Sequence, residues 1–591
     1  MLNLCSFIPL IYLRMRRSAT LLSLAAATLL VLSACSSSRR SGGGGLPAYR
    51  YEIQKKVLAT KGAVVSAHPL ASQVGLQILK KGGNAVDAAI ATQLALAVVY
   101  PNAGNIGGGG FMVARLQRGD LLALDYRETA PAASRKDMYL DAQGNPLPDK
   151  SQNGHLSSGV PGTVAGLFAA HRHAKLPFAT LIGPAIELAE KGFAITEREA
   201  RSLNALQADL KRFNTREPVF IRAQWKSGDT LIQKDLAATL RRIRDGGAAG
   251  FYEGETARLI EEEMQRGGGI LTREDLRGYQ AKYREAHRFN YKGYEIVGMP
   301  MPSSGGVLLH QMMKMTEPRN IGALGFHSAE AVQLMTEIMR RAFADRAYYM
   351  GDPDYTKVPV GLITADFYLT NRMKDYDSSK PTPSSRIGPG RVLQLATESE
   401  ETTHLSVLDQ EGNAVAVTTT LNNSYGSRTV VGGAGFFLND EMDDFSISPG
   451  VPNMYGAIGG EANSIQAGKR MLSSMTPTLV LKDGKPHIVI GTPGGTTIPT
   501  QIYQTLLNLL EFGLSTEDAV YKPKFHHQWM PDELVTEKGF SSAVLSILKR
   551  MGYPTGKERG GIGRTEIIRV RPDGKIEAVA DFRGDDSAAG Y

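Results

Sequence analysis

The sequence predicts a layered α/β fold in which helices cover antiparallel sheets. Apolar residues make up 42% and charged residues 21% of the 591 positions. This composition suits a folded chain with a large buried core and excludes a disordered chain or a coiled coil. Pairs of apolar segments are joined by short polar turns, which is typical of β-hairpins. Helical patterns lie between the hairpins, and this mixed order indicates sheets packed against helices.

The first elements of the body are a strand, a buried helix and a hairpin. Residues 62–66 predict a strand. Asn84 can cap a helix over residues 85–99, whose surface is almost wholly apolar, so we expect that helix to be deeply buried. A hairpin is predicted to join residues 111–116 to residues 121–126.

A long helical region and a polar segment follow. Residues 160–350 are predicted to be mostly helical. The clearest helices there cover residues 181–192, 237–246 and 329–350. Residues 376–400 are polar and rich in Ser and Pro, which predicts an exposed, mobile loop.

Three more hairpins and two helices complete the body. The hairpins are predicted over residues 403–408 with 414–420, 478–481 with 487–490, and 565–570 with 576–580. Further helices are expected over residues 500–512 and 542–551. Hairpins place neighbouring strands antiparallel, so we expect antiparallel sheets.

The N-terminal segment resembles a bacterial export signal. A basic start at Met15-Arg16-Arg17 precedes a short apolar run, and small residues then lead to Cys35. We interpret residues 1–34 as a lipoprotein signal peptide, Cys35 as the lipidated residue and residues 35–54 as a flexible tether. A plain cleaved signal peptide with an incidental cysteine is the alternative, and Met15 is an alternative start.

Composition argues against several classes of function. The net charge of +8 is mild for this length and no basic block occurs, so nucleic acid is a poor candidate partner. Both cysteines lie near the N-terminus, so the rest of the chain has no Cys-ligated zinc and no catalytic cysteine. No metal-ligand spacing accompanies His404, His526 or His527, so we expect structural histidines, no metal and no cofactor.

A glycine run at residues 105–110 has the appearance of a nucleotide-binding loop. It precedes a strand and no helix follows it, so the dinucleotide interpretation is weak. Tight backbone packing near a site is the better explanation, because glycine lets backbones approach closely.

Thr402 is the first candidate nucleophile. The polar loop runs directly into a predicted strand at this residue. If the chain is cut before Thr402, the new α-amine lies beside the threonine hydroxyl and can act as its base, since such amines have a pKa near 8. The alternative is that Thr402 and Thr403 are ordinary β-branched strand residues.

Short segments spread over the body decide between these interpretations. They include Thr402-Thr403-His404 and Pro493-Gly494-Gly495. The others are residues 62–65, 82–89, 125–128, 345–346, 413–418, 420–422, 442–445 and 472–475. Together and in this order they resemble the γ-glutamyltransferase (glutathione hydrolase) family. The resemblance implies a four-layer αββα fold of the N-terminal-nucleophile hydrolase class, and a precursor that cuts itself into a large subunit (55–401) and a small subunit (402–591).

The resemblance also assigns the catalytic roles. Thr402 would attack the carbonyl of Glu401 during self-cleavage, and afterwards the γ-amide of a glutamyl substrate. Thr420 resembles the threonine that orients the nucleophile. Gly494 and Gly495 resemble an oxyanion hole, because two backbone N–H groups without side chains can approach the tetrahedral oxygen.

Substrate recognition would use charges of both signs. Arg127 resembles the residue that pairs with the substrate's α-carboxylate, with Ser473 and Ser474 as hydroxyl donors. Acceptors for the α-ammonium would be Glu441 and Asp444, with Asn422 assisting. Asp444 argues for a cationic amino group on the ligand and against glutaryl-type substrates. Residues 449–460, which include Tyr455, resemble a lid loop.

The implied function is a γ-glutamyl hydrolase and transferase. Glutathione is the expected donor, water or an amino acid or dipeptide the acceptor, and the two subunits form a heterodimer. The protein would be exported and tethered by its lipid on the periplasmic side, with the outer membrane expected because Ser36 follows Cys35. A β-lactam acylase of the same superfamily and a non-catalytic surface lipoprotein are the alternatives.

Overall fold

Two seven-stranded antiparallel sheets form the centre of the molecule. The computed structural model describes residues 51–388, 402–448 and 459–591. The first sheet, called here the β10 sheet, contains in spatial order β18 (Ser587–Gly590), β2 (Ala63–Ser66), β10 (Thr402–Leu408), β11 (Ala414–Thr420), β3 (Gly109–Arg115), β4 (Leu121–Asp125) and β7 (Lys282–Arg284). The second, called the β13 sheet, contains β1 (Lys56–Ala59), β17 (Ile576–Val579), β16 (Glu566–Val570), β13 (Lys485–Gly491), β12 (Thr478–Lys482), β9 (Tyr294–Gly298) and β8 (His287–Tyr291).

The two sheets pack face to face through small and branched side chains. Ala414 and Ala416 of β11 lie in the same buried cluster as Leu479 of β12, Val489 of β13 and Ile568 of β16. Alternate residues of each strand point the other way, toward helices, because side chains alternate across a strand. The central strands β10 and β11 are therefore buried on both faces.

One helix layer covers the outer face of the β10 sheet, and its side chains share a buried cluster with those of β10 and β11. It contains α2 (Pro69–Lys80), α3 (Ala85–Val99), α5 (Thr163–His171), α6 (Phe178–Lys191), α7 (Glu197–Phe213), α8 (Lys234–Gly246), α9 (Ala249–Tyr252), α10 (Gly254–Gly267) and α11 (Arg273–Gly278). Helix α3 is buried along its whole length, and Asn84 caps it through a reciprocal bond with Asp87. Both features were predicted.

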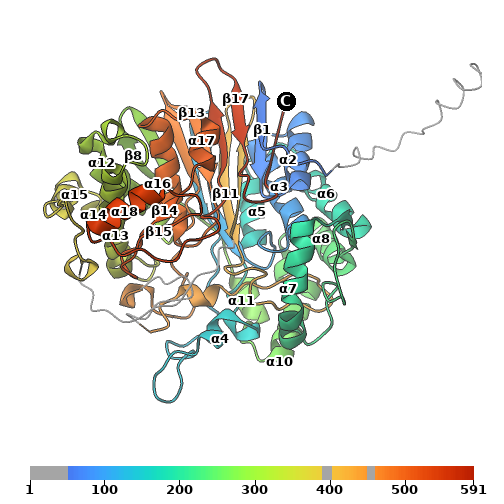
Figure 1. Cartoon of the computed structure of the whole chain (residues 1–591). Coiled ribbons are helices and arrows are strands. Elements are labelled where there is room, and N and C mark those ends of the chain that lie inside the picture. Colours follow the sequence, from blue (N-terminus) through green and yellow to red (C-terminus); the bar gives the residue numbers. More distant parts are fainter. Residues whose placement is uncertain (1–50, 389–401, 449–458) are drawn as a thin grey trace, which may run out of the picture. The chain divides into compact units, whose positions relative to one another are not determined.

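A second helix layer covers the outer face of the β13 sheet. It contains α12 (Gly305–Thr316), α13 (Ala329–Tyr349), α14 (Val360–Ile363), α15 (Asp366–Arg372), α16 (Thr497–Leu510), α17 (Thr516–Tyr521) and α18 (Ser542–Arg550). Figure 1 shows the strands between these two groups of helices. The four-layer αββα order implied by the family resemblance is thus confirmed.

All four predicted hairpins and the predicted helices are present within a few residues of the expected bounds. The prediction that residues 160–350 are mostly helical missed the strands within that stretch. Strands β7, β8 and β9 lie inside that stretch, and β8 and β9 form a hairpin through Lys292 and Gly293, which both have positive φ. The burial of β8 alternates, as expected for a strand at a sheet edge, and β9, which lies between β8 and β12, is partly buried at its start.

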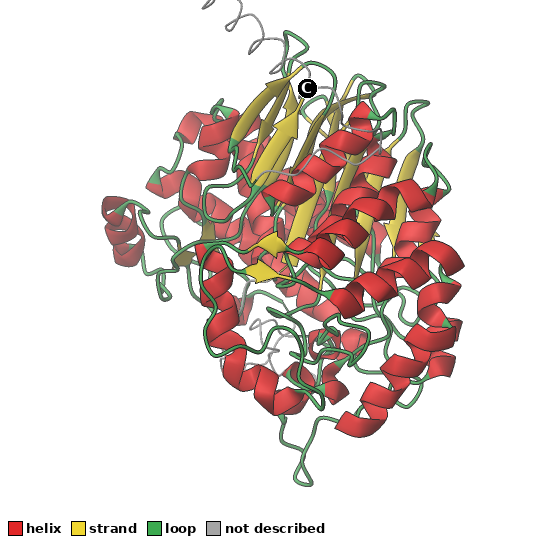
Figure 2. Cartoon of the chain, turned by 90° about the vertical axis from the view of Figure 1, so that its right-hand side faces the viewer, coloured by secondary structure: helices red, strands yellow, loops and turns green. Residues whose placement is uncertain are grey.

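Short elements and loops extend beyond one end of the sheets. Figure 2 shows helices and loops below the strands on this side. The elements there include α4 (Pro148–Gln152). Two short strand pairs are separate from the large sheets, β5 (Phe193–Ala194) with β6 (Thr230–Leu231) and β14 (Phe525–His526) with β15 (Val535–Thr536), and a 3₁₀ turn covers Glu441–Asp444. No helix of the described ranges combines the length and the apolar character needed to cross a membrane.

Candidate active site

A small cavity lies where β10 begins and β11 ends. It is lined by Arg127, Arg346, Thr402, Thr420, Asn422, Glu441, Asp444, Ser473, Ser474, Met475, Gly495, Thr496 and Ile498. The structure therefore brings together nearly every site residue predicted within the described ranges, although they are spread over more than 350 positions of the chain.

Thr402 and Thr420 face each other across the hairpin. They are register partners on β10 and β11, and their hydroxyl oxygens lie 3.5 Å apart. The backbone N–H of Asn422 donates to the Thr420 hydroxyl at 2.8 Å. That oxygen is thereby held beside the Thr402 hydroxyl, which is the position that the predicted orienting role of Thr420 requires.

The glycine run packs directly against the end of β11. A Cβ atom on Gly108 would lie 2.1 Å from the Thr420 carbonyl oxygen. The Asn105 side chain donates to the same oxygen at 2.9 Å. The predicted role of this run, tight backbone packing near a site, is confirmed.

A buried arginine and two carboxylates form the charged wall of the cavity, and a third carboxylate, Glu128, contacts the arginine without lining the cavity. Arg127 is fully buried, and its Nη1 lies 2.6 Å from Glu441 Oε2. Its Nη2 donates to Asp444, and Glu128 approaches Nη1 at 3.4 Å. A fork of this kind matches two carboxylate oxygens at once.

Burial changes the proton affinity of these carboxyls. Burial raises the pKa of Glu128 to about 7, against the opposing effect of Arg127. Burial likewise raises the pKa of Glu441 and Asp444 above their usual range, and Arg127 again opposes it. Burial alone would lower the pKa of Arg127, but Glu441 and Asp444 raise it above its ordinary value, so the guanidinium stays charged.

Two serines and a second arginine form another part of the cavity lining. Ser473 and Ser474 are 2% and 8% exposed, so both are buried at the cavity surface. Arg346 of α13 donates to the Ser474 hydroxyl at 3.0 Å. The sequence analysis noted Asp345-Arg346 as part of the family pattern but gave Arg346 no role.

The predicted oxyanion turn connects β13 to α16. Gly494 and Gly495 have φ values of 132° and 53°, which favour glycine. The Gly494 carbonyl accepts a hydrogen bond from the Thr497 backbone at 3.0 Å, which fixes the turn to the first residue of the helix. Gly495 lines the cavity, whereas its neighbour in the turn, Gly494, is not among the lining residues.

The three histidines are buried and hydrogen-bonded, as predicted for structural residues. His404 bonds Thr418 at 2.8 Å and Ser406 at 3.1 Å, and burial lowers its pKa to about 3. His526 and His527 also have polar partners, and burial lowers their pKa to about 3 and 4. In the described part of the chain no cluster of three or more His, Cys, Asp or Glu residues could hold a metal ion.

Three predicted site residues lie outside the described residues. These are Cys35, the proposed lipid attachment point, Glu401 on the other side of the expected cut, and Tyr455 of the expected lid.

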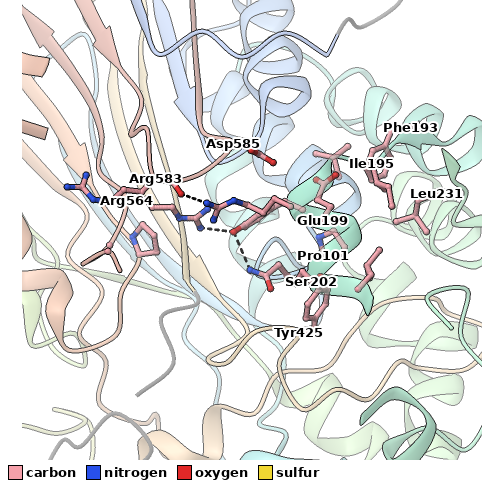
Figure 3. Close-up of a pocket in the computed structure, with 18 of the residues that line it drawn as sticks. Pro101, Phe193, Ile195, Glu199, Ser202, Leu231, Tyr425, Arg564, Arg583 and Asp585 are labelled. Atoms are coloured by element: carbon pink, nitrogen blue, oxygen red, sulfur yellow. Dashed lines mark hydrogen bonds between the residues drawn. The ribbon is translucent and has the colours of Figure 1, made fainter. Parts of the chain in front are cut away.

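A second cavity is larger but has different chemistry. Its volume is about 500 Å³. Figure 3 shows its apolar side chains, which include Phe193 and Leu231, and its charged ones, which include Arg564 and Arg583. None of the predicted site residues lines it. The smaller cavity, which contains Thr402, is therefore the candidate active site.

The layered fold and the threonine that heads a central strand define an N-terminal-nucleophile hydrolase. Comparisons with known proteins support this class and narrow it. Residues 71–591 match the family described as gamma-glutamyltranspeptidase. The chain belongs to the γ-glutamyltranspeptidase family.

Curated relatives cover almost the whole chain. It is 44% identical over 554 residues to the glutathione hydrolase proenzyme of Escherichia coli (strain K12), covering 92% of this chain and 95% of the relative. It is 38% identical to the glutathione hydrolase proenzyme of Bacillus subtilis (strain 168), covering 92% and 94%. It is also 34% identical to an acylase ACY 1 proenzyme of Pseudomonas sp. (strain V22), covering 90% and 94%.

Solved structures give the same fold. A cephalosporin acylase from Bacillus halodurans has a TM-score of 0.79 at 26% identity and covers 94% of this chain and 99% of its own. The γ-glutamyltranspeptidase of Helicobacter pylori has a TM-score of 0.54 at 42% identity, and it covers 59% of this chain and 100% of its own.

Proposed function

We propose that this protein is a self-cleaving γ-glutamyl hydrolase and transferase. It cleaves the γ-glutamyl bond of glutathione and related compounds and passes the glutamyl group to water, an amino acid or a dipeptide. One observation carries the proposal: the Thr402 hydroxyl lies in a buried cavity that also holds Arg127 and the carboxylates of Glu441 and Asp444. A zwitterionic amino acid has the matching charges, and its far end would reach the hydroxyl.

The first step would be cleavage of the precursor. The Thr402 hydroxyl oxygen attacks the carbonyl carbon of Glu401, the C–N bond breaks and an ester forms. Water then opens the ester, which leaves a carboxylate on Glu401 and a free α-amine on Thr402. The products are a large subunit ending at residue 401 and a small subunit of residues 402–591. The names of the relatives as proenzymes support this step.

The same hydroxyl would then perform the reaction on the substrate. The α-amine of Thr402 accepts the hydroxyl proton, and the oxygen attacks the γ-carbonyl. Backbone N–H groups of Gly494 and Gly495 stabilise the oxyanion. The C–N bond breaks, the leaving amine takes the proton, and an ester on Thr402 remains. Water or an acceptor amine then attacks this ester and releases Thr402.

The charged wall would recognise the amino-acid head of the substrate. Arg127 and the two serines bind the α-carboxylate, and Glu441, Asp444 and Asn422 bind the α-ammonium. Without substrate the guanidinium pairs with the two carboxylates themselves. When a zwitterion binds, its carboxylate pairs with Arg127 and its ammonium pairs with Glu441 and Asp444. Binding therefore leaves no buried charge uncompensated.

We also propose that the protein is exported and that a lid loop covers the cavity. Residues 1–34 are a signal peptide, Cys35 is lipidated, and residues 35–54 tether the enzyme to the periplasmic side of a membrane, the outer one in our proposal. Tyr455 belongs to a lid over the cavity. The support for these points is the sequence alone.

Incorporation of radiolabelled palmitate into the wild type but not into Cys35→Ala would test lipidation, and equal labelling of both would contradict it.

Intact masses of the purified protein and of Thr402→Ala test the central proposal. We expect two pieces from the wild type, with the smaller beginning at Thr402, and one uncut chain from the variant. The cut wild type should release nitroaniline from γ-glutamyl-4-nitroanilide. A wild type that stays whole after long incubation would contradict the enzyme and favour a binding protein.

Acylase activity on glutaryl amides is the second candidate function, since acylases are among the similar proteins. Glu441 and Asp444 disfavour it, because a glutaryl group has no ammonium for these buried carboxylates. Turnover of glutaryl-4-nitroanilide without turnover of the γ-glutamyl compound would reverse this choice.

A further inference from the structure

Arg346 connects helix α13 to the serine wall of the cavity. It is 7% exposed, and it lines the cavity although most of α13 packs on the β13 sheet. Its guanidinium donates to two hydroxyls, from Nη2 to Ser474 at 3.0 Å and from Nε to Ser304 at 3.1 Å. One side chain therefore contacts two serines at once.

These contacts determine the direction of the hydrogen bond at Ser474. A guanidinium has donors only, so the Ser474 oxygen must accept from Arg346. The serine hydrogen is then directed to another acceptor. Within the described residues no group accepts it, and Ser474 lines the cavity. The Ser474 hydroxyl can therefore donate its hydrogen to an acceptor on a bound substrate.

Ser304 and Ser473 extend the same arrangement. Ser304 accepts from Arg346 and donates its own hydrogen to the Ser473 carbonyl at 2.8 Å. The Ser473 hydroxyl oxygen accepts from the Met475 N–H at 3.1 Å. The hydroxyl hydrogens of Ser473 and Ser474 are thus both available to donate into the cavity that these residues line.

We propose that Arg346 is a positioning residue that makes Ser474 a hydrogen-bond donor and thereby selects a carboxylate at the α-carbon of the substrate. The inference rests on the proposed γ-glutamyl specificity. A carboxylate only accepts hydrogen bonds, so it suits a wall of donors. An α-carboxamide presents an NH₂ group, which would meet donors and lose at least one bond.

Two substrates that differ in this one group test the proposal. They are γ-glutamyl-4-nitroanilide and its α-carboxamide, the γ-anilide of isoglutamine. The ratio of their kcat/KM values measures preference for the carboxylate. We expect Arg346→Lys to lower this ratio roughly tenfold. Lysine keeps the positive charge but cannot donate to both serines in one fixed geometry.

A double-mutant cycle separates positioning from general damage. Ser474→Ala should lower the ratio by a similar factor, because the two residues act through one hydroxyl. Arg346→Lys combined with Ser474→Ala should lower it no further than Ser474→Ala alone. Intact masses of each variant show what fraction is cut, so rates are compared per molecule of cut enzyme.

Arg340→Lys is the matched control. Arg340 is another buried arginine of α13, 1% exposed, and it contacts Ser384 and Asp532 rather than the cavity. Its substitution should change kcat/KM equally for both substrates. Equal changes for both substrates in Arg346→Lys, or an additional loss in the double variant, would overturn the inference. A wild type that cleaves neither compound would instead overturn the proposed function.

Discussion

The hydroxyl of Thr420 has a partner on each side. It lies 3.5 Å from the Thr402 hydroxyl and accepts from the Asn422 N–H at 2.8 Å. We expect Thr420→Val, which keeps the shape but removes the hydroxyl, to lower kcat on the order of 100-fold, since the nucleophile loses its fixed neighbour. Steady-state kinetics on γ-glutamyl-4-nitroanilide measure this.

Thr419→Val is the control on the next residue of the strand. Its side chain points to the other face and donates to the Gly109 carbonyl at 2.7 Å. This variant should lose stability while kcat per cut molecule changes little. A larger kcat loss from Thr419→Val than from Thr420→Val would contradict the orienting role.

Glu128 predicts a pH dependence of stability. Burial raises its pKa in the folded protein to about 7, above the unfolded value of about 4.3. The folded state therefore binds this proton more tightly. The associated stability is fully present below the unfolded pKa and is lost as the pH rises through the folded one.

Thermal unfolding at pH 5 and pH 8 checks this prediction. Measured on uncut Thr402→Ala, the decrease in Tm between these pH values should be smaller when Glu128→Gln is added, because glutamine does not titrate. An equal decrease with and without the substitution would show that Glu128 titrates normally.

The role of a site residue could be predicted from the sequence where a local sequence pattern indicated it. Thr402 was singled out because a polar loop runs into a predicted strand and because Thr402-Thr403-His404 resembles the family pattern, and Arg127 because it belongs to another segment of that pattern. Arg346 could not be assigned a role, since its importance depends on contacts with Ser304 and Ser474, which are far away in the sequence. Neither could the raised pKa of Glu128, which arises from burial in the tertiary structure.

Among the elements, the glycine run before β3 gives a sharp prediction. A methyl group on Gly108 would meet the Thr420 carbonyl at 2.1 Å and the Asn105 side chain at 2.8 Å. The Thr420 backbone on one side and the hydrogen-bonded Asn105 side chain on the other leave little room for the methyl group. Gly108→Ala should therefore shift the end of β11. We expect an uncut or slowly cut chain in intact-mass measurements.

Gly183→Ala is the matched control for this substitution. Gly183 lies within α6, and no atom lies within 4 Å of the added methyl position. Alanine is also the better helix former there, so normal cutting and an unchanged or higher Tm are expected. Normal cutting of Gly108→Ala as well would show that the packing is not needed.

Elements were predictable when their turns and periodicity were clear. The β10–β11 hairpin has a polar turn between two apolar strands, and α3 has an Asn cap before an apolar run. The β8–β9 hairpin was missed because its strands are only five residues long and lie within a region dominated by helices. Its tight turn needs positive φ at Lys292, which is uncommon for lysine.

Across the whole molecule, both sheets mix strands from the two sides of the expected cut. In the β10 sheet, β2 lies between β18 and β10, and in the β13 sheet β9 pairs with β12. Each piece alone would expose long unpaired strand edges. The two pieces should therefore co-elute on size exclusion under native conditions and separate only in denaturant. Separation in native buffer would contradict the shared-sheet arrangement.

The position of β10 between β2 and β11 implies that the chain folds before it is cut. The uncut chain can bring these strands together during folding, because the covalent connection keeps them close to one another. Once severed, the fragments must find each other again by diffusion, while their exposed edges favour aggregation. The working enzyme would then be a kinetically trapped product, able to persist but poorly able to be remade. After removal of denaturant, uncut Thr402→Ala should recover its native spectrum far more completely than the cut wild type.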